Sequence, residues 1–180
     1  MKRSVHLILT LVLSMIFVQA YPQNAELFFK AAGSPVNPKV QVSWNKYYTY
    51  DGINDFCKKL AKEYPDLVSM ESAGKSYQGR DIIALTITDK KTGNPGKKPG
   101  FYIDGNIHSN EIQGTEMAMY TAWYLCEMFD ENKFINELLK DKTFYILPTI
   151  NPDARQYFMD EPNTASSPRS GLVPMDNDRD

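Results

Sequence analysis

The stretch Tyr102-Ile-Asp-Gly-Asn-Ile-His-Ser-Asn-Glu-Ile-Gln-Gly-Thr115 decides both the fold and the chemistry of this chain. It begins as an apolar strand, passes a glycine at position 105 and ends in the start of a helix. The turn carries His108 and Glu111, an imidazole and a carboxylate that can bind one metal ion if both point inward. We therefore interpret His108 and Glu111 as candidate metal ligands.

These two residues also have a purely structural interpretation. Glu111 would merely cap the helix, while His108 would hydrogen-bond to the backbone. The spacing alone leaves both interpretations open, because a histidine and a glutamate three residues apart often occur by chance. The position of Gly105 favours the metal interpretation, since a glycine lets the strand turn tightly into the loop.

Hydrophobic periodicity predicts an α/β fold. Helices are expected over residues 49–64, 111–128 and 132–140, and strands over residues 68–72, 81–88, 100–107 and 143–147. The sequence predicts a loop over residues 90–98 and irregular backbone after Ile150. Helices that alternate with strands predict a mixed, mostly parallel sheet covered on both sides, with ligands bound beyond the carboxyl ends of strands.

The composition is that of one folded domain. The chain has 180 residues, of which 42% are hydrophobic, and its 20 basic and 22 acidic residues are scattered. No basic surface for nucleic acid is therefore expected. Cys57 and Cys126 lie on apolar helical faces, where we expect free buried thiols rather than a disulfide.

Residues 1–20 have the pattern of a secretory signal peptide. Lys2 and Arg3 precede an apolar run from Leu7 to Val18, and Ala20 ends the segment. A membrane anchor is the alternative, but this run is shorter than the roughly 20 residues that cross a bilayer. We expect a secreted or periplasmic protein that has no stable membrane insertion after signal removal. Residues 21–46 are expected to form a linker or arm, and the folded unit to span residues 47–180.

Three motifs, in this order, resemble the front half of a zinc carboxypeptidase of the M14 family: Gly74-Lys-Ser-Tyr-Gln-Gly-Arg80, the run from Gly105 to Glu111, and Asn151-Pro-Asp153. The resemblance covers residues from about Tyr47 to Asp180, the N-terminal portion of a metallocarboxypeptidase catalytic domain. It implies a zinc-carboxypeptidase-like sheet flanked by helices, incomplete in this chain, and a peptide or protein substrate. It also implies that His108 and Glu111 bind Zn²⁺ and that Arg169 contacts the substrate.

The chain departs from the family pattern at several positions. Asn110 and Ala154 stand where the family commonly has an arginine and a glycine, and Asp178 separates Asn177 from Arg179, so we transfer no carboxylate-binding role to that pair. The only other histidine is His6 in the signal segment. The third zinc ligand and the general base are missing, so no catalytic residue is assigned. We expect an amino-terminal piece of a longer enzyme that is inactive alone.

Three functions remain open from the sequence. The first is a metallocarboxypeptidase that hydrolyses C-terminal peptide bonds with a metal-activated water. The second is a related zinc amidase that acts on cell-wall peptides or acyl-amino acids, and the third is a non-catalytic binding module. Asp176, Asp178 and Asp180 alternate like the start of a Ca²⁺-binding loop, and a solvated acidic tail is the alternative.

Overall fold

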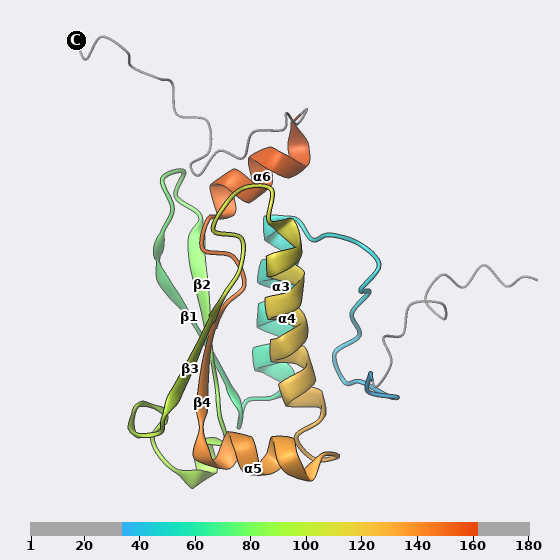
Figure 1. Ribbon diagram of the computed structural model, residues 1–180, viewed down its shortest axis with the longest axis vertical. Helices are drawn as coiled ribbons and strands as arrows, with labels where there is room; N and C mark the ends of the chain where they lie inside the picture. Colours follow the sequence, from blue (N-terminus) through green and yellow to red (C-terminus); the bar gives the residue numbers. More distant parts are fainter. Residues whose placement is uncertain (1–33, 162–180) are drawn as a thin grey trace, which may run out of the picture. The chain divides into compact units, whose positions relative to one another are not determined.

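The computed structural model describes residues 34–161 (Figure 1). Residues 1–20, which are expected to be a signal peptide, lie outside these residues, as do Arg169 and the three aspartates at positions 176, 178 and 180. In chain order the elements are α3 (Tyr50–Glu63), β1 (Val68–Lys75), β2 (Asp81–Ile87), β3 (Gly100–Asp104), α4 (Ile112–Glu127), α5 (Lys133–Asp141), β4 (Thr143–Leu147) and α6 (Pro152–Asp160). The loop predicted over residues 90–98 contains two short 3₁₀ turns, Lys90–Thr92 and Pro95–Lys97.

The strands form one mixed sheet in the order β1-β2-β4-β3. β1 pairs with β2, and β2 with β4, in antiparallel fashion, whereas β3 and β4 are parallel. The predicted α/β class and mixed sheet are confirmed, but two of the three pairings in the described residues are antiparallel. The β1–β2 hairpin agrees with the sequence, in which a turn containing Gly74 and Gly79 joins the two predicted strands. The antiparallel pairing of β2 with β4 joins strands that are distant in the sequence, so no local pattern predicts it.

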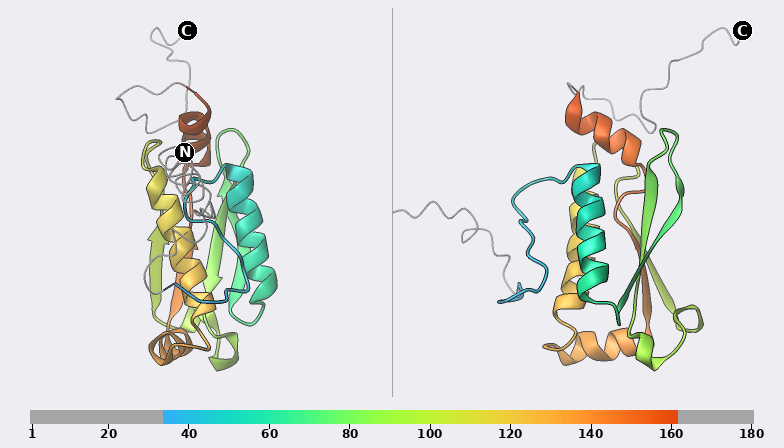
Figure 2. Two further views of the ribbon diagram at one scale, coloured as in Figure 1. Left: turned by 90° about the vertical axis from the view of Figure 1, so that its right-hand side faces the viewer. Right: turned by 180° about the vertical axis from the view of Figure 1, so that it is seen from behind.

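Helices α3 and α4 lie side by side on one face of the sheet (Figures 1 and 2). The core between these layers is apolar. It includes Ile53, Phe56, Cys57 and Leu60 of α3, Ile83, Leu85 and Ile87 of β2, and Met119 and Trp123 of α4. The predicted stripe on α3 is therefore confirmed. Thr49 caps this helix, with its Oγ1 accepting a hydrogen bond of 3.3 Å from the N–H of Gly52.

Both cysteines are free and buried, as predicted. Burial raises the pKa of Cys57 to about 12, so its thiol stays protonated at neutral pH. Within residues 34–161, no helix has the length and apolar character that would let it cross a bilayer.

Strand β3 lies at one edge of the described sheet, where it pairs only with β4. Two of its aromatic side chains are accessible to solvent, with Phe101 49% and Tyr102 63% exposed. Phe101 stacks on Phe144 of the neighbouring strand, with 5.0 Å between the ring centroids. The edge strand is therefore apolar and accessible at the same time.

The prediction of irregular backbone after Ile150 is wrong for residues 152–160, which form α6. The start signals of a helix are present in the sequence. The Asn151 side chain accepts a hydrogen bond from the N–H of Ala154, and Pro152 occupies the first turn, where its missing N–H costs nothing. A proline and an asparagine at this point are equally typical of a turn, so the sequence pattern alone does not distinguish the two structures.

Residues that precede α3 pack against the carboxyl end of α4. Glu127, which is only 8% exposed, accepts hydrogen bonds from two successive backbone N–H groups, those of Lys39 at 2.9 Å and Val40 at 2.8 Å. The Val40 carbonyl in turn accepts a hydrogen bond of 2.8 Å from Nε1 of Trp123. One buried carboxylate therefore fixes the path of this segment on the helix.

We expect Glu127→Gln to lower the free energy of unfolding by about 2 kcal/mol. A glutamine offers one acceptor oxygen, so its amide NH₂ would face one of the two backbone donors and leave it unpaired. Urea unfolding would measure the loss, with Glu131→Gln at an exposed position as the matched control. Equal stability of the two variants would contradict the expected contribution of the Glu127 carboxylate.

Candidate metal centre

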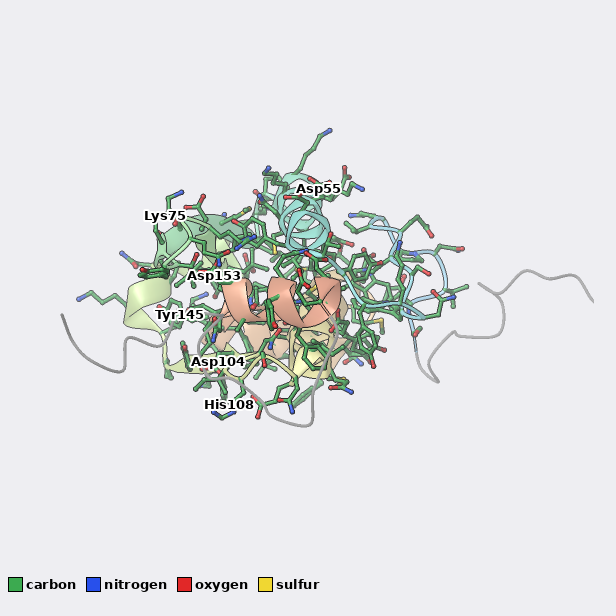
Figure 3. The ribbon with its side chains drawn as sticks, turned by 90° about the horizontal axis from the view of Figure 1, so that it is seen from above. Asp55, Lys75, Asp104, His108, Tyr145 and Asp153 are labelled. Carbon is green, nitrogen blue, oxygen red and sulfur yellow. The ribbon has the colours of Figure 1, made fainter. Side chains whose placement is uncertain are left out.

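The candidate metal ligands lie in the loop between β3 and α4, beyond the carboxyl end of β3. Because β3 and β4 are parallel, the segments that follow them emerge at the same end of the sheet. Figure 3 looks onto this end and shows His108 at its rim, with Asp153 nearer the middle. The sequence-based expectation that His108 lies beyond a strand end is therefore confirmed.

Gly105 has a different role from the one expected. The residue with left-handed backbone is Asn106, with a φ of 57°, so the sharp turn falls one residue later. A glycine is needed at position 105 because backbone atoms approach it closely. A Cβ there would lie 2.6 Å from the carbonyl oxygen of Gly114 and 2.7 Å from that of Pro148. The absence of a side chain thus lets α4 and the segment after β4 close around the loop.

His108 and Glu111 face each other. Nδ1 of His108 lies 2.9 Å from Oε1 of Glu111, and the backbone N–H of His108 donates a hydrogen bond of 3.0 Å to Oε2 of Glu111. Glu111 occupies the N-cap position of α4, yet its side chain makes no capping hydrogen bond. The side chain of Glu111 therefore does not cap α4, and its hydrogen bonds are with His108 instead.

The carboxylate is held in its charged form and stays accessible. The imidazole and the backbone N–H of His108 lower the pKa of Glu111 from its usual value. The side chains of His108 and Glu111 are 33% and 49% exposed, so a cation can reach both from solvent. A deprotonated carboxylate beside an accessible imidazole is a suitable donor pair for Zn²⁺.

The distance between the two donor atoms can be compared with the needs of zinc. Two donors of a tetrahedral zinc, each about 2.1 Å from the metal, lie roughly 3.4 Å apart. Nδ1 of His108 and Oε1 of Glu111, at 2.9 Å, need only a small separation to accept the ion. The residues therefore fit a metal, and a neutral imidazole that bound it through Nδ1 would carry its proton on Nε2.

Within residues 34–161, His108 and Glu111 are a pair of candidate ligands without a third beside them. No group of three or more histidine, cysteine, aspartate or glutamate side chains within residues 34–161 is arranged to hold a metal ion. A catalytic zinc normally takes three protein ligands and a water. A catalytic zinc at this pair would therefore need a further ligand from outside the described residues.

Asp153 links this end of the sheet to the turn between β1 and β2. Its carboxylate, only 5% exposed, accepts hydrogen bonds from Oγ of Ser76 at 2.9 Å, the N–H of Gln78 at 2.9 Å and Nη1 of Arg80 at 2.7 Å. Burial raises the pKa of Asp153, but these donors outweigh it and leave the pKa below the usual value. The first and third sequence motifs are thus joined by one carboxylate.

Asn151 links the third motif to residues 105–111, the loop that carries His108 and Glu111 and is called the metal loop below. Its Nδ2 donates a hydrogen bond of 3.2 Å to the carbonyl of Ile107, the residue before His108. Ile150 also donates its N–H to the carbonyl of Gly105 at 3.1 Å. The three motifs that are far apart in the sequence therefore form one hydrogen-bonded unit behind His108.

Two residues of this unit were not identified from the sequence. Asn106 is 2% exposed, and its Nδ2 donates to the carbonyl of His108 at 2.6 Å. An asparagine directly after a glycine at a strand end is a signal for left-handed backbone that could have identified it. Arg155 is 1% exposed, and its partners come from distant segments, so no local pattern marks it.

The chain is similar to known proteins over most of the described residues. A family model described as zinc carboxypeptidase matches residues 53–172. Carboxypeptidase B of Astacus astacus is 38% identical over 118 residues, which cover 64% of this chain and 36% of that protein. An inactive metallocarboxypeptidase of Ajellomyces capsulatus is 29% identical over 136 residues, covering 76% of this chain and 23% of the relative. The chain thus spans about a third or less of the length of these relatives.

The fold is also that of a solved structure. The crystal structure of carboxypeptidase A from Helicoverpa armigera superposes with a TM-score of 0.59 at 24% sequence identity. The match covers 76% of this chain and 32% of that chain. The mixed sheet and its helices are therefore those seen in part of a larger carboxypeptidase fold.

Proposed function

Because the chain belongs to the zinc carboxypeptidase family, we propose that it forms part of a zinc-dependent enzyme that hydrolyses C-terminal peptide bonds of peptides or proteins. One observation carries this proposal. Nδ1 of His108 and Oε1 of Glu111 lie 2.9 Å apart on a loop whose Ile107 carbonyl accepts a hydrogen bond from Asn151 of the third motif. We assign these two residues as metal ligands, with the third ligand supplied from outside residues 34–161.

Zinc bound at this pair would lower the pKa of a coordinated water toward neutrality and so supply the nucleophile. His108 and Glu111 would hold the ion at a fixed position. The N–H of His108 holds Oε2 of Glu111, which would leave Oε1 to bind the ion. Arg169 is the residue that we propose to contact the substrate carbonyl, where a fixed cation stabilises developing negative charge.

Export is the second part of the proposal. The basic residues Lys2 and Arg3, followed by the apolar run from Leu7 to Val18, support cleavage of a signal peptide and a secreted or periplasmic location. N-terminal sequencing of the exported protein would test the cut after Ala20. An intact N-terminus on the exported protein would contradict it.

Zinc binding by the full chain tests the ligand assignment. We expect competition with a chromophoric chelator to detect one weak Zn²⁺ site in the wild type, because two protein ligands are present rather than three. His108→Ala and Glu111→Gln should both abolish it. Glu63→Gln, an exposed carboxylate at the end of α3, is the matched control and should bind zinc as the wild type does. Binding that survives in both site variants would place the metal elsewhere.

Activity needs its own measurement, since the family includes a relative that its name calls inactive. The longest protein that the gene encodes would be incubated with a peptide that has a free carboxyl terminus. Zinc-dependent release of single C-terminal residues, lost in Glu111→Gln, is the expected result. Release of an acyl group instead would favour an amidase, and no hydrolysis by a zinc-loaded protein would favour a binding module.

A further inference from the structure

Arg155 brings a positive charge into the interior of the protein. Its side chain is 1% exposed and it is the largest fully buried residue among those that the structure describes. A buried charge is costly unless every donor is satisfied. An arginine at this position must therefore make polar contacts that an apolar side chain of similar size could not make.

All five N–H donors of the Arg155 guanidinium have acceptors. Nε and Nη2 donate to the carbonyl of Tyr48 at 3.1 and 2.8 Å, and Nη2 also forms an ion pair with Oε1 of Glu116. Nη1 donates to the carbonyl of Ile112 at 2.8 Å and to Oδ1 of Asn106 at 3.1 Å. The cation thus joins the segment before α3, the first turn of α4 and the metal loop.

The contact with Asn106 determines which way that side-chain amide faces. Oδ1 of Asn106 accepts from Arg155 and, at 3.4 Å, from Oγ1 of Thr115. Its Nδ2, on the opposite side of the amide, therefore donates to the carbonyls of His108 at 2.6 Å and Ser109 at 3.3 Å. Both sides of the amide are used, so rotating it would place donor against donor and acceptor against acceptor.

These contacts form a continuous connection from a buried cation to the metal-ligand pair. We propose that Arg155 is a positioning residue: by orienting the Asn106 amide, it fixes the backbone of the His108 turn and so the direction in which His108 faces Glu111. The proposal deepens the proposed function and rests on it for its link to zinc. None of the five hydrogen bonds of Arg155 goes to His108 or Glu111, so its effect on this pair is indirect.

A lysine could not replace this arginine. Its ammonium is a single point with three donors, whereas the acceptors here lie on several sides of a planar fork. A lysine could satisfy Glu116 and the Tyr48 carbonyl, which would preserve the charge and part of the packing. The contact with Asn106 would then be lost. Arg155→Lys therefore separates positioning of the loop from burial of a positive charge.

The experiment uses the full chain and follows the His108 imidazole by NMR. The chain has two histidines, so His6→Gln leaves a single imidazole in the spectrum. In this parent we expect one sharp ring resonance, together with slow exchange of the His108 and Glu111 backbone N–H groups. In Arg155→Met and Arg155→Lys, the resonance should shift or split toward the free imidazole value, and exchange of both groups should accelerate.

Zinc affinity gives a second measurement. Both Arg155 variants should bind Zn²⁺ about tenfold more weakly, which is the low end of the loss seen when supporting partners of metal ligands are removed. Glu127→Gln is the control for loss of stability alone, since it acts at the opposite end of α4. It should lower the melting temperature while the His108 resonance and the zinc affinity stay unchanged.

A variant of Asn106 keeps the proposal testable if the Arg155 variants fail to fold. Asn106→Asp retains the acceptor for Arg155 but replaces the Nδ2 donor by an oxygen that repels the carbonyls of His108 and Ser109. We expect the same displacement of the His108 resonance. An unchanged resonance in folded Arg155→Lys, or in Asn106→Asp, would overturn the proposal. A parent that binds no zinc would contradict the proposed function, while the resonance would still test the positioning.

Discussion

Replacing Gly105 by alanine is expected to lower the free energy of unfolding by about 3 kcal/mol, at the upper end of the usual cost of overpacking. The added Cβ would lie 2.6 Å from the carbonyl oxygen of Gly114 and 2.7 Å from that of Pro148. Both are backbone atoms of packed segments, so neither can move aside by changing a rotamer. Relief requires α4 or the segment after β4 to shift away from the metal loop.

Urea unfolding and zinc titration of the same Gly105→Ala sample would measure the two consequences. Gly96→Ala is the matched control, because a Cβ at Gly96 would meet only an ordinary contact of 3.5 Å with Oδ1 of Asn94. Its stability should stay within about 0.5 kcal/mol of the wild type. Stability of Gly105→Ala within that same range would show that the close approach is not rigid.

Asp153→Asn is expected to destabilise the protein by about 3 kcal/mol at pH 7, because removal of the charge weakens three hydrogen bonds and leaves the Arg80 cation without its partner. Arg80 is 28% exposed, so water compensates part of the loss. The turn between β1 and β2 would detach from α6, and we expect faster backbone exchange at Gln78. The exposed Asp55→Asn in α3 is the control.

The same carboxylate predicts how the stability depends on pH. The pKa of Asp153 is lower in the folded protein than in the unfolded chain, so its stabilising contribution is complete above the unfolded value of about 4. The contribution is lost as the pH falls through the folded pKa. The difference in unfolding free energy between the wild type and Asp153→Asn should therefore shrink below pH 4. A difference that stays constant from pH 7 to pH 2 would contradict this assignment.

The parts that sequence analysis predicted correctly are those determined by local patterns. The stripe of Ile53, Phe56 and Leu60 repeats with the helical period, so α3 could be located to within a residue. His108 and Glu111 face each other across a single turn, so their spacing was informative. In each case the residues that interact are neighbours in the chain, and only one local conformation had to be inferred.

The parts that were missed depend on contacts between distant residues. Arg155 bonds to residues that are 39 to 107 positions away, and no spacing in the sequence encodes that network. The antiparallel pairing of β2 with β4 is likewise a matter of tertiary arrangement. The prediction of irregular backbone after Ile150 was wrong for α6 for another reason, since the helix-start signals at Asn151 and Pro152 are also typical of irregular backbone.

The accessible edge of β3 has a practical consequence for anyone who prepares residues 34–161 as a separate protein. A strand with unpaired N–H and C=O groups beside two accessible aromatic rings is a template for strand addition, and such edges promote self-association. Light scattering should then rise with protein concentration. Lysine in place of Tyr102 would place a charge on that edge and should improve the yield of monomer.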